Sequence, residues 1–225
     1  RHGEQRDGNW LDRVLNAKKA EVRAAAVRVY GDWLIKSGLT ALEGEGVFQM
    51  DRRHVMSALI PRVSDESPRV RIEAIRALSK LSGATALDLA LKALEKPTDR
   101  FIEYALWLNV QEHGDEWLAS LMSENGNASS DPRSIEFVLA NLPPAKATAA
   151  ITKLLPKPLP KDGSGPWLAL GLKNGDASVL GAIYEQAASN GFDAATTTKA
   201  LRGLNDAISQ RQVKPAGDGA KLLPI

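Results

Sequence analysis

The chain has 225 residues, with 29 Lys and Arg against 27 Asp and Glu, 3 His and no Cys, and its formal charge is +2. Hydrophobic residues make up 44% and charged residues 25%, which is the composition of an ordinary globular protein. The lack of cysteine excludes disulfides, thiolate metal sites, cysteine nucleophiles and covalently attached haem from these residues. No run of about 18 apolar residues is present, so no membrane insertion is predicted.

The charge is distributed unevenly along the chain. Residues 1–100 have a net charge of +4, residues 101–142 of −6, and residues 143–225 again of +4. A nucleic-acid-binding protein usually has a continuous basic stripe. The acidic middle segment would interrupt such a stripe, and nucleic acid is therefore not the favoured partner.

A short pattern repeats in the first half of the chain. The sequence V-R-x-x-A-(V/I)-R begins at Val22 and again at Val70, and a weaker copy begins at Phe101. An apolar-periodic stretch precedes each copy, at residues 10–15, 55–63 and 87–94. Each unit is therefore predicted to be two amphipathic helices joined by a short turn. One such pair cannot bury its apolar face alone, but stacked pairs can.

Later segments continue the alternation of helices and turns. We predict pairs from residues 117–122 with 132–142, 145–155 with 166–172, and 177–189 with 194–210. Asp131 and Asp193 are predicted N-caps, and Asn190-Gly191 is a predicted helix stop. No segment alternates apolar and polar residues as a strand would. The sequence therefore predicts an all-α fold.

Residues 59–71 (LIPRVSDESPRVR) resemble a HEAT repeat. The resemblance implies an armadillo-type α–α superhelix, which is a right-handed solenoid of antiparallel helix pairs. The positions that match the repeat signature are Pro61, Asp65, Val70, Arg71, Ala74 and Leu78.

In HEAT proteins, the Asp and Arg of this signature form a ladder between neighbouring repeats. The first unit has Ala17 at the Asp position, and the third has Lys96 there and Ile102 at the Arg position. The resemblance therefore supports the ladder only at the second unit.

Three segments follow from this interpretation. Residues 1–142 are predicted to be HEAT-like helix pairs, with a polar loop at 40–52 and an acidic part at 101–142. Residues 143–166 hold six of the twelve prolines and are predicted to be a Pro-rich connection. Residues 167–225 are predicted to add further helix pairs to the same solenoid.

A narrower resemblance rests on residues 99–107, Trp117 and residues 199–215. These segments are similar to the helical-repeat region of large bacterial multidomain proteins labelled membrane-bound dehydrogenases. In that family a β-propeller precedes the repeats and a c-type cytochrome domain follows them. The resemblance implies that this chain, which starts at Arg1, is the middle section of a longer protein or a processed product. It also implies that haem c belongs to a flanking domain and that the location is extracytoplasmic (periplasmic).

No catalytic, cofactor-binding or metal site is predicted. The best ionisable cluster, residues 112–116 (EHGDE), has two interpretations. It could be a cation-binding or acid–base patch, or a polar turn in which Gly114 ends one helix and Asp115 caps the next, and the turn is favoured. The glycine triplets at 44–46 and 163–165 lack the features of a phosphate-binding loop and are interpreted as loops.

The chain has five tryptophans, for which packing between helices is favoured over stacking on a ligand. They are Trp10, Trp33, Trp107, Trp117 and Trp167.

Repeat alignment places Arg28, Arg76 and Trp107 at equivalent positions on successive second helices, which line the concave face of a HEAT stack. We predict this set as a candidate interaction surface for an acidic partner. The competing interpretation, a solvated face salt-bridged by Glu73 and Glu103, is favoured on general grounds. The predicted function is a non-catalytic scaffold for protein–protein or interdomain docking. The alternative is a HEAT-like DNA glycosylase or nucleic-acid-binding module, and no oligomeric state is predicted.

Overall fold

The computed structural model describes residues 13–36, 52–81, 83–123, 128 and 131–218. Throughout these ranges the regular structure is helical and no strand is present, so the predicted all-α fold is confirmed. None of the helices in these ranges is both long and apolar enough to cross a bilayer. The chain divides into two compact units, residues 1–129 and 130–225.

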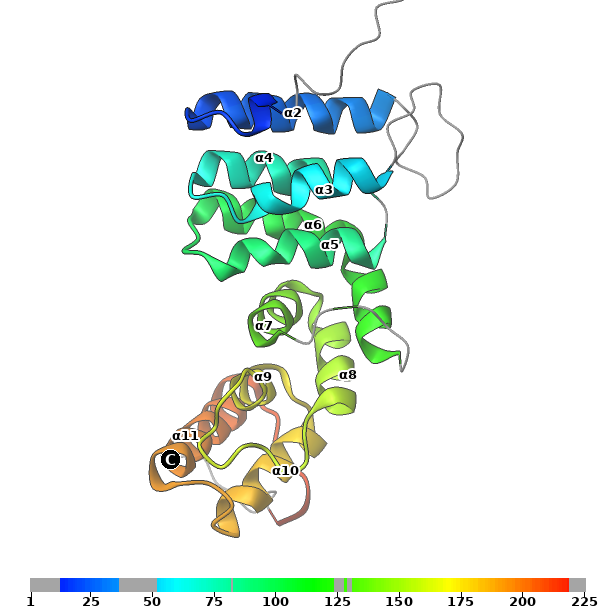
Figure 1. Ribbon diagram of the computed structural model, residues 1–225. Helices are drawn as coiled ribbons and strands as arrows, with labels where there is room; N and C mark the ends of the chain where they lie inside the picture. The colour runs from blue at the N-terminus through cyan, green and yellow to red at the C-terminus, as the bar shows by residue number, and fades with distance from the viewer. Residues whose placement is uncertain (1–12, 37–51, 82, 124–127, 129–130, 219–225) are drawn as a thin grey trace, which may run out of the picture. The chain divides into compact units, whose positions relative to one another are not determined.

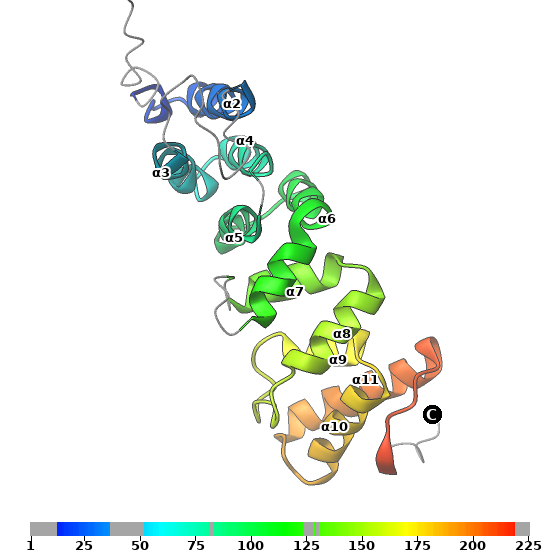
Figure 2. The ribbon, with the colours of Figure 1, turned by 90° about the vertical axis from the view of Figure 1, so that its right-hand side faces the viewer.

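The first unit consists of helices stacked in two layers. Its elements are α2 (Ala20–Lys36), α3 (Arg52–Val63), α4 (Pro68–Leu78), α5 (Ala84–Leu91), the short 3-10 helix η1 (Lys92–Glu95) and α6 (Arg100–Met122). Figure 2 shows α2, α4 and α6 in one layer and α3 and α5 in the other. This arrangement confirms the predicted alternation of first and second helices. The predicted loop at 40–52 lies almost entirely outside the described residues.

The core of the first unit lies between the two layers. The signature residues Val70, Ala74 and Leu78 have no exposed surface, as their helical spacing predicts. Pro68 occupies the first turn of α4, where its missing N–H removes no helical hydrogen bond. Pro61 lies inside α3, two residues before that helix ends. The repeat signature therefore directs α4 into the core.

The predicted helix break at Gly114 is wrong, because α6 continues from Arg100 to Met122. Gly114 is buried, and the buried His113 Nε2 lies 3.1 Å from the carbonyl oxygen of Ser79. Four residues later, Trp117 has no exposed surface and its Nε1 donates to Asp88 Oδ1 at 3.1 Å. These contacts keep the segment helical, so tertiary packing overrides the weak helix propensity of glycine.

The second unit contains five helices in the part of it that the structure describes. They are α7 (Pro132–Asn141), α8 (Pro144–Leu154), α9 (Trp167–Asn174), α10 (Ala177–Ala188) and α11 (Ala194–Arg211). The last three pack against one another (Figure 1). The predicted caps are confirmed, since Asp131 accepts from the N–H of Ser134 and Asp193 from that of Thr196. Asn190 follows α10 with a φ of 59°, as predicted for a helix stop.

Hydrogen bonds tie the end of the Pro-rich segment to later residues of the second unit, and one runs from the N–H of Asp193 to the carbonyl oxygen of Lys161 at 3.0 Å. The amide of Gln186 accepts from the N–H of Leu159 at 2.9 Å and donates to the carbonyl oxygen of the same residue at 2.8 Å. The boundary between the compact units falls before α7, and residues 143–166 lie inside the second unit. The domain limits drawn from the sequence stay a prediction, because compactness does not show which segments fold independently.

The two tryptophans of α6, Trp107 and Trp117, should differ in how much their replacement lowers the free energy of unfolding. Trp117→Ala removes a fully buried ring, and we expect it to lower the free energy of unfolding by about 3–5 kcal/mol. Trp107→Ala removes a ring that is 38% exposed, and we expect a loss below about 1 kcal/mol. Urea denaturation followed by far-UV circular dichroism measures both. Equal losses would contradict the orientation of α6.

Candidate interaction surface

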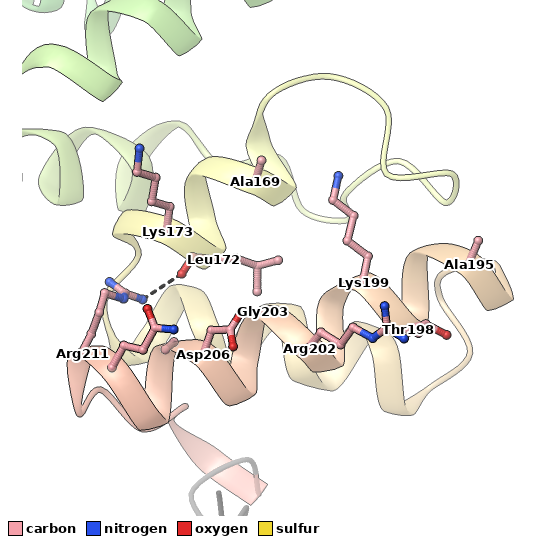
Figure 3. Close-up of a pocket in the computed structure, with 12 residues that line it drawn as sticks. Ala169, Leu172, Lys173, Ala195, Thr198, Lys199, Arg202, Gly203, Asp206 and Arg211 are labelled. Carbon is pink, nitrogen blue, oxygen red and sulfur yellow. Dashed lines mark hydrogen bonds between the residues drawn. The ribbon is translucent and has the colours of Figure 1, made fainter. Parts of the chain in front are cut away.

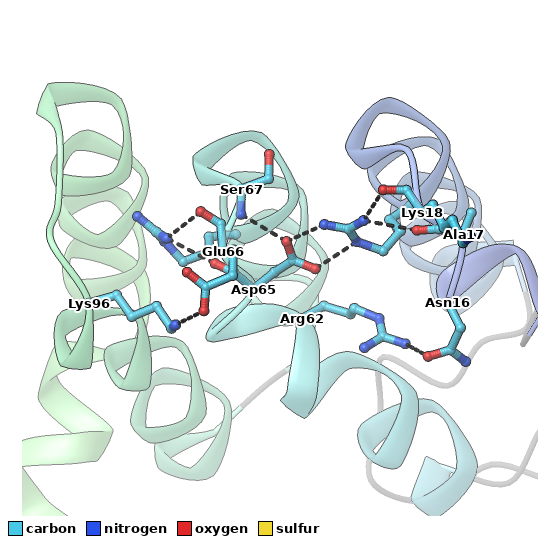
Figure 4. Close-up of polar contacts among 10 residues, drawn as sticks. Asn16, Ala17, Lys18, Arg62, Asp65, Glu66, Ser67 and Lys96 are labelled. Carbon is cyan, nitrogen blue, oxygen red and sulfur yellow. Dashed lines mark hydrogen bonds and ion pairs between the residues drawn. The ribbon is translucent and has the colours of Figure 1, made fainter.

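A partly buried ion pair joins the first repeat to the second (Figure 4). Arg23 Nε donates to Asp65 Oδ2 at 2.8 Å, and its Nη2 donates to Asp65 Oδ1 at 2.7 Å. The remaining Nη1 donates to the carbonyl oxygens of Ala17 and Lys18 in its own repeat. A bidentate pair of this kind fixes both distance and direction. A rung needs the Arg of one repeat and the Asp of the next. The ladder therefore begins at the first unit, and the absence of an Asp at Ala17 does not interrupt it.

The next rung uses different chemistry. Arg71 holds its own turn as Arg23 does, since its Nη1 donates to the carbonyl oxygen of Asp65 at 2.9 Å. Its Nη2 reaches the third repeat and donates to the carbonyl oxygen of Pro97 at 2.7 Å. The buried Nε of Arg71 has no hydrogen-bond partner. Arg71 thus makes one hydrogen bond to the next repeat, whereas Arg23 makes two. Next to Arg71, Lys96 of the third repeat pairs with Glu66 of the second. In this pair the later repeat supplies the cation, whereas in the pair of Arg23 with Asp65 the earlier repeat does.

The surroundings of Asp65 favour its charged form. Burial alone would raise the pKa of Asp65, but the hydrogen bonds from Arg23 and from the N–H of Ser67 outweigh burial, and the pKa lies below its ordinary value. The hydrogen bond to Asp65 likewise raises the pKa of Arg23. Burial lowers the pKa of the neighbouring Arg62, whose Nη2 donates to Asn16 Oδ1 at 2.8 Å. Asp65 is thus an anion that Arg23 contacts directly and that the positive charge of Arg62 also stabilises.

The structure brings Arg28 and Arg76 together through one carboxylate. Arg28 of α2 pairs with Glu73 of α4, and Arg76 lies 3.9 Å from the same side chain. The arginine side chains are 59% and 65% exposed, while that of Glu73 is 8% exposed. The salt-bridged interpretation is confirmed for Glu73, and the interaction surface for an acidic partner stays a prediction. The arginines form ion pairs on the surface, and one positive charge remains uncompensated in this group of three.

Trp107, the third predicted member, belongs to a different group. It stacks on Tyr104, with ring centroids 5.7 Å apart and planes 19° apart. Phe101 and Leu108 lie on the same exposed side of α6, and the guanidinium of Arg100 lies 4.7 Å from the centroid of the Phe101 ring. We call Phe101, Tyr104, Trp107 and Leu108 the α6 aromatic face. Their exposed fractions run from 38% to 60%.

The structure shifts the repeat alignment of α6 by one residue. Ser67 is the N-cap of α4 and Asp99 that of α6, so each α4 position corresponds to the α6 position 32 residues later and not 31. The buried Ile102 and Leu106 of α6 then match the buried Val70 and Ala74 of α4. Phe101, Tyr104 and Leu108 occupy positions that are exposed or half-buried in α4, where the residues are Arg69, Ile72 and Arg76. An exposed cluster of large apolar side chains is a common mark of a protein-binding surface.

Sequence reasoning named only one member of the α6 aromatic face and favoured packing for its tryptophan. The prediction of a buried ring is confirmed for Trp117 and wrong for Trp107. The missed residues were visible as apolar side chains at i, i+3 and i+7 from Phe101. A sequence pattern of that kind shows that a helix has an apolar face but not whether a neighbour covers it. Trp10 lies outside the described residues.

The other predicted clusters do not form a site. Residues 112–116 lie along one continuous helix, with His113 buried and Glu112 exposed. Gly163 and Gly165 have φ values of 63° and 78° and lie in the loop before α9. No group of three or more His, Asp or Glu side chains in the described ranges is placed to hold a metal ion. The triplet at 44–46 is not described.

Comparison with known families supports the repeat assignment. Residues 9–108 match the family model described as HEAT repeats. Neither the curated proteins nor the solved structures gave a match to the chain. Together with the stacked helix pairs, the family match shows that residues 9–108 form a HEAT-repeat region with the predicted HEAT-type fold.

The two carboxylates of the α3–α4 turn allow a matched test of the ladder. Asp65→Ala leaves Arg23 partly buried without its anion, and we expect it to lower the free energy of unfolding by about 3 kcal/mol. Glu66→Ala removes a pair whose carboxylate is 88% exposed, and we expect a loss below about 1 kcal/mol. Urea denaturation of both variants measures the difference, and a reversed order would contradict the assignment of the rung.

The lowered pKa of Asp65 also predicts how stability depends on pH. The unfolded chain has an ordinary Asp pKa near 3.9, so the stabilising effect is complete above that pH and is lost as the pH falls through the lower folded-state value. We therefore expect the stability difference between wild type and Asp65→Asn to shrink between pH 6 and pH 3. Thermal unfolding at the two pH values tests this, and a constant difference would show that the ion pair contributes little.

Proposed function

We propose that this chain is a non-catalytic helical-repeat scaffold that docks a protein surface on the α6 aromatic face. The observation that supports the proposal is the exposure of Phe101, Tyr104, Trp107 and Leu108 on one helix of a HEAT-repeat region. HEAT repeats generally mediate protein interactions, and tryptophan and tyrosine are the side chains that most often dominate binding energy at interfaces.

The partner patch should combine apolar and acidic groups. Apolar side chains would cover the stacked rings of Tyr104 and Trp107 and release the water in contact with them. Carboxylates would meet the exposed guanidinium groups of Arg28, Arg76 and Arg100, whose planar geometry suits bidentate pairing. The proposed surface keeps the acidic partner expected from the sequence. Its apolar centre is the four residues of the α6 aromatic face, where the sequence hypothesis had Trp107 alone.

The context of the chain is a second part of the proposal. By its resemblance to the repeat region of bacterial dehydrogenase–cytochrome c fusion proteins, we place it as the middle section of such a protein, outside the cytoplasm, where it would dock the flanking domains. Haem c would then be bound by a flanking domain only. Sequencing of the gene on both sides tests this, and a reading frame without a C-x-x-C-H motif or a propeller would contradict it.

The docking proposal predicts that the α6 aromatic face controls partner affinity. Replacing Phe101, Tyr104 and Trp107 together with Ala should raise the dissociation constant at least about 30-fold, since the loss of central aromatic contacts costs about 2 kcal/mol or more. A partner captured from the source cells and then purified is titrated by calorimetry against each variant. Alanine keeps α6 helical, so the melting temperature should change little.

The matched control is the double variant Val22→Ala and Leu201→Ala, which removes exposed apolar side chains elsewhere. It should bind as the wild type does. Equal weakening by both variants would contradict a specific surface. Tight binding of duplex DNA that falls steeply with salt would favour the glycosylase alternative instead.

A further inference from the structure

A groove lies between α9 and α11 in the second unit (Figure 3). Its volume is about 540 Å³, which is within the range of about 300–1,000 Å³ usual for ligand sites. The residues that line it include Lys173 of α9 and Lys199 and Arg202 of α11. On α11 the spacing from Lys199 to Arg202 and Asp206 places these side chains on one face of the helix.

A fourth cation at the end of the groove is already engaged. Arg211 donates from Nη2 to the carbonyl oxygen of Leu172 at 2.9 Å and from Nη1 to that of Gly175 at 3.1 Å. These carbonyls lie in the last turn of α9 and at its C-cap, where helical acceptors lack partners and a cation is favourable. Arg211 therefore fixes α11 against α9 and shapes the groove.

The other three cations have no ion-pair partner among the residues that the structure describes. In the first unit, by contrast, Arg23 and Lys80 each meet a carboxylate of a neighbouring repeat. The second unit uses its carboxylates differently. Asp131, Asp176 and Asp193 accept hydrogen bonds at the N-termini of α7, α10 and α11. Positive charge therefore collects in the groove and exceeds the single carboxylate, that of Asp206, which also lines it.

The floor of the groove is apolar and shallow. It is formed by small side chains of the two helices and by Leu172, and a Cβ added to Gly203 would lie 2.6 Å from Leu172 Cδ1. The glycine thus allows α9 and α11 to approach closely beneath the cationic rim. Asp206 adds one carboxylate beside the cations.

We infer that the groove between α9 and α11 binds an acidic peptide segment of a protein. Carboxylates of the segment would pair with Lys173, Lys199 and Arg202, and its apolar side chains would lie on the small residues of the floor. Asp206 would accept a hydrogen bond from a peptide N–H, whereas it would repel a phosphate of a nucleic acid. A phosphodiester backbone also has no apolar group to cover the floor. This site goes beyond the proposed docking function, because it lies in the other unit and uses other residues.

The inference is tested with a defined probe. Fluorescein-labelled EALEEALEEALE is titrated with the full chain at low ionic strength, and fluorescence anisotropy reports binding. The variant Lys173→Gln, Lys199→Gln, Arg202→Gln should bind this peptide at least about tenfold more weakly than the wild type does. Asp206→Asn should retain the binding, since an amide oxygen still accepts a hydrogen bond.

The matched control is Lys153→Gln, Lys157→Gln, Lys161→Gln, which removes the same charge from exposed positions of the same unit outside the groove. It should change the affinity less than twofold, and the uncharged peptide QALQQALQQALQ should not bind. Equal weakening by both triple variants, or no binding of the acidic peptide at millimolar protein, overturns the inference. Tighter binding of a twelve-nucleotide poly(dT) strand, or displacement of the peptide by equimolar inorganic phosphate, also overturns it.

Discussion

The contact of Arg23 with Asp65 is the directional interaction on which the arrangement of the first two repeats depends. Burial of Val27 and Ala74 between α2 and α4 drives the helices together, but apolar contact alone allows the helices to slide and rotate. The bidentate pair removes that freedom, because both oxygens of Asp65 and two nitrogens of Arg23 must align. Two further ion pairs join α2 to the second repeat, and they are Arg28 with Glu73 and Asp32 with Lys80. The helices of this repeat therefore keep a defined orientation even though small side chains such as Ala74 lie between them.

The change of rung chemistry leaves the packing of the next helix unchanged. Arg71 donates to the carbonyl oxygen of Pro97, at the place where Arg23 meets the carboxylate of Asp65, and its Nε is left without a partner. Beyond this rung, Ile102 and Leu106 of α6 are buried as the matching Val70 and Ala74 of α4 are. Apolar packing therefore sets the orientation of α6.

The α6 aromatic face arises from side-chain identity. Phe101 and Leu108 stand at positions where α4 has the exposed Arg69 and Arg76. Large apolar side chains have replaced charged ones on the solvent side of the helix, which gives this repeat an apolar surface that α4 lacks.

The parts of this structure that sequence could predict are those decided by short-range rules. Proline at the start of α4 and aspartate before α7 and α11 act within one helical turn, so the helix starts they predict are correct. The continuity of α6 through Gly114 could not be predicted, because His113 and Trp117 contact residues about 30 positions earlier. The same limit applies to the candidate surface. Periodicity showed that α6 has apolar faces, but which face lacks a neighbour depends on how α6 packs against α4 and α5. The groove in the second unit depends likewise on the pairing of two helices separated in sequence by α10.

The two candidate surfaces differ in the physical force that would act on a partner. The α6 aromatic face offers apolar area, and its contribution to binding depends little on ionic strength. The groove offers Lys173, Lys199 and Arg202 against the one carboxylate of Asp206. Attraction between exposed charges is screened over about 8 Å at physiological salt. A segment that pairs with the groove must therefore make close contact, because attraction from a distance is weak there. The small residues of the floor make that contact possible, since they allow a peptide backbone to approach the three cations directly.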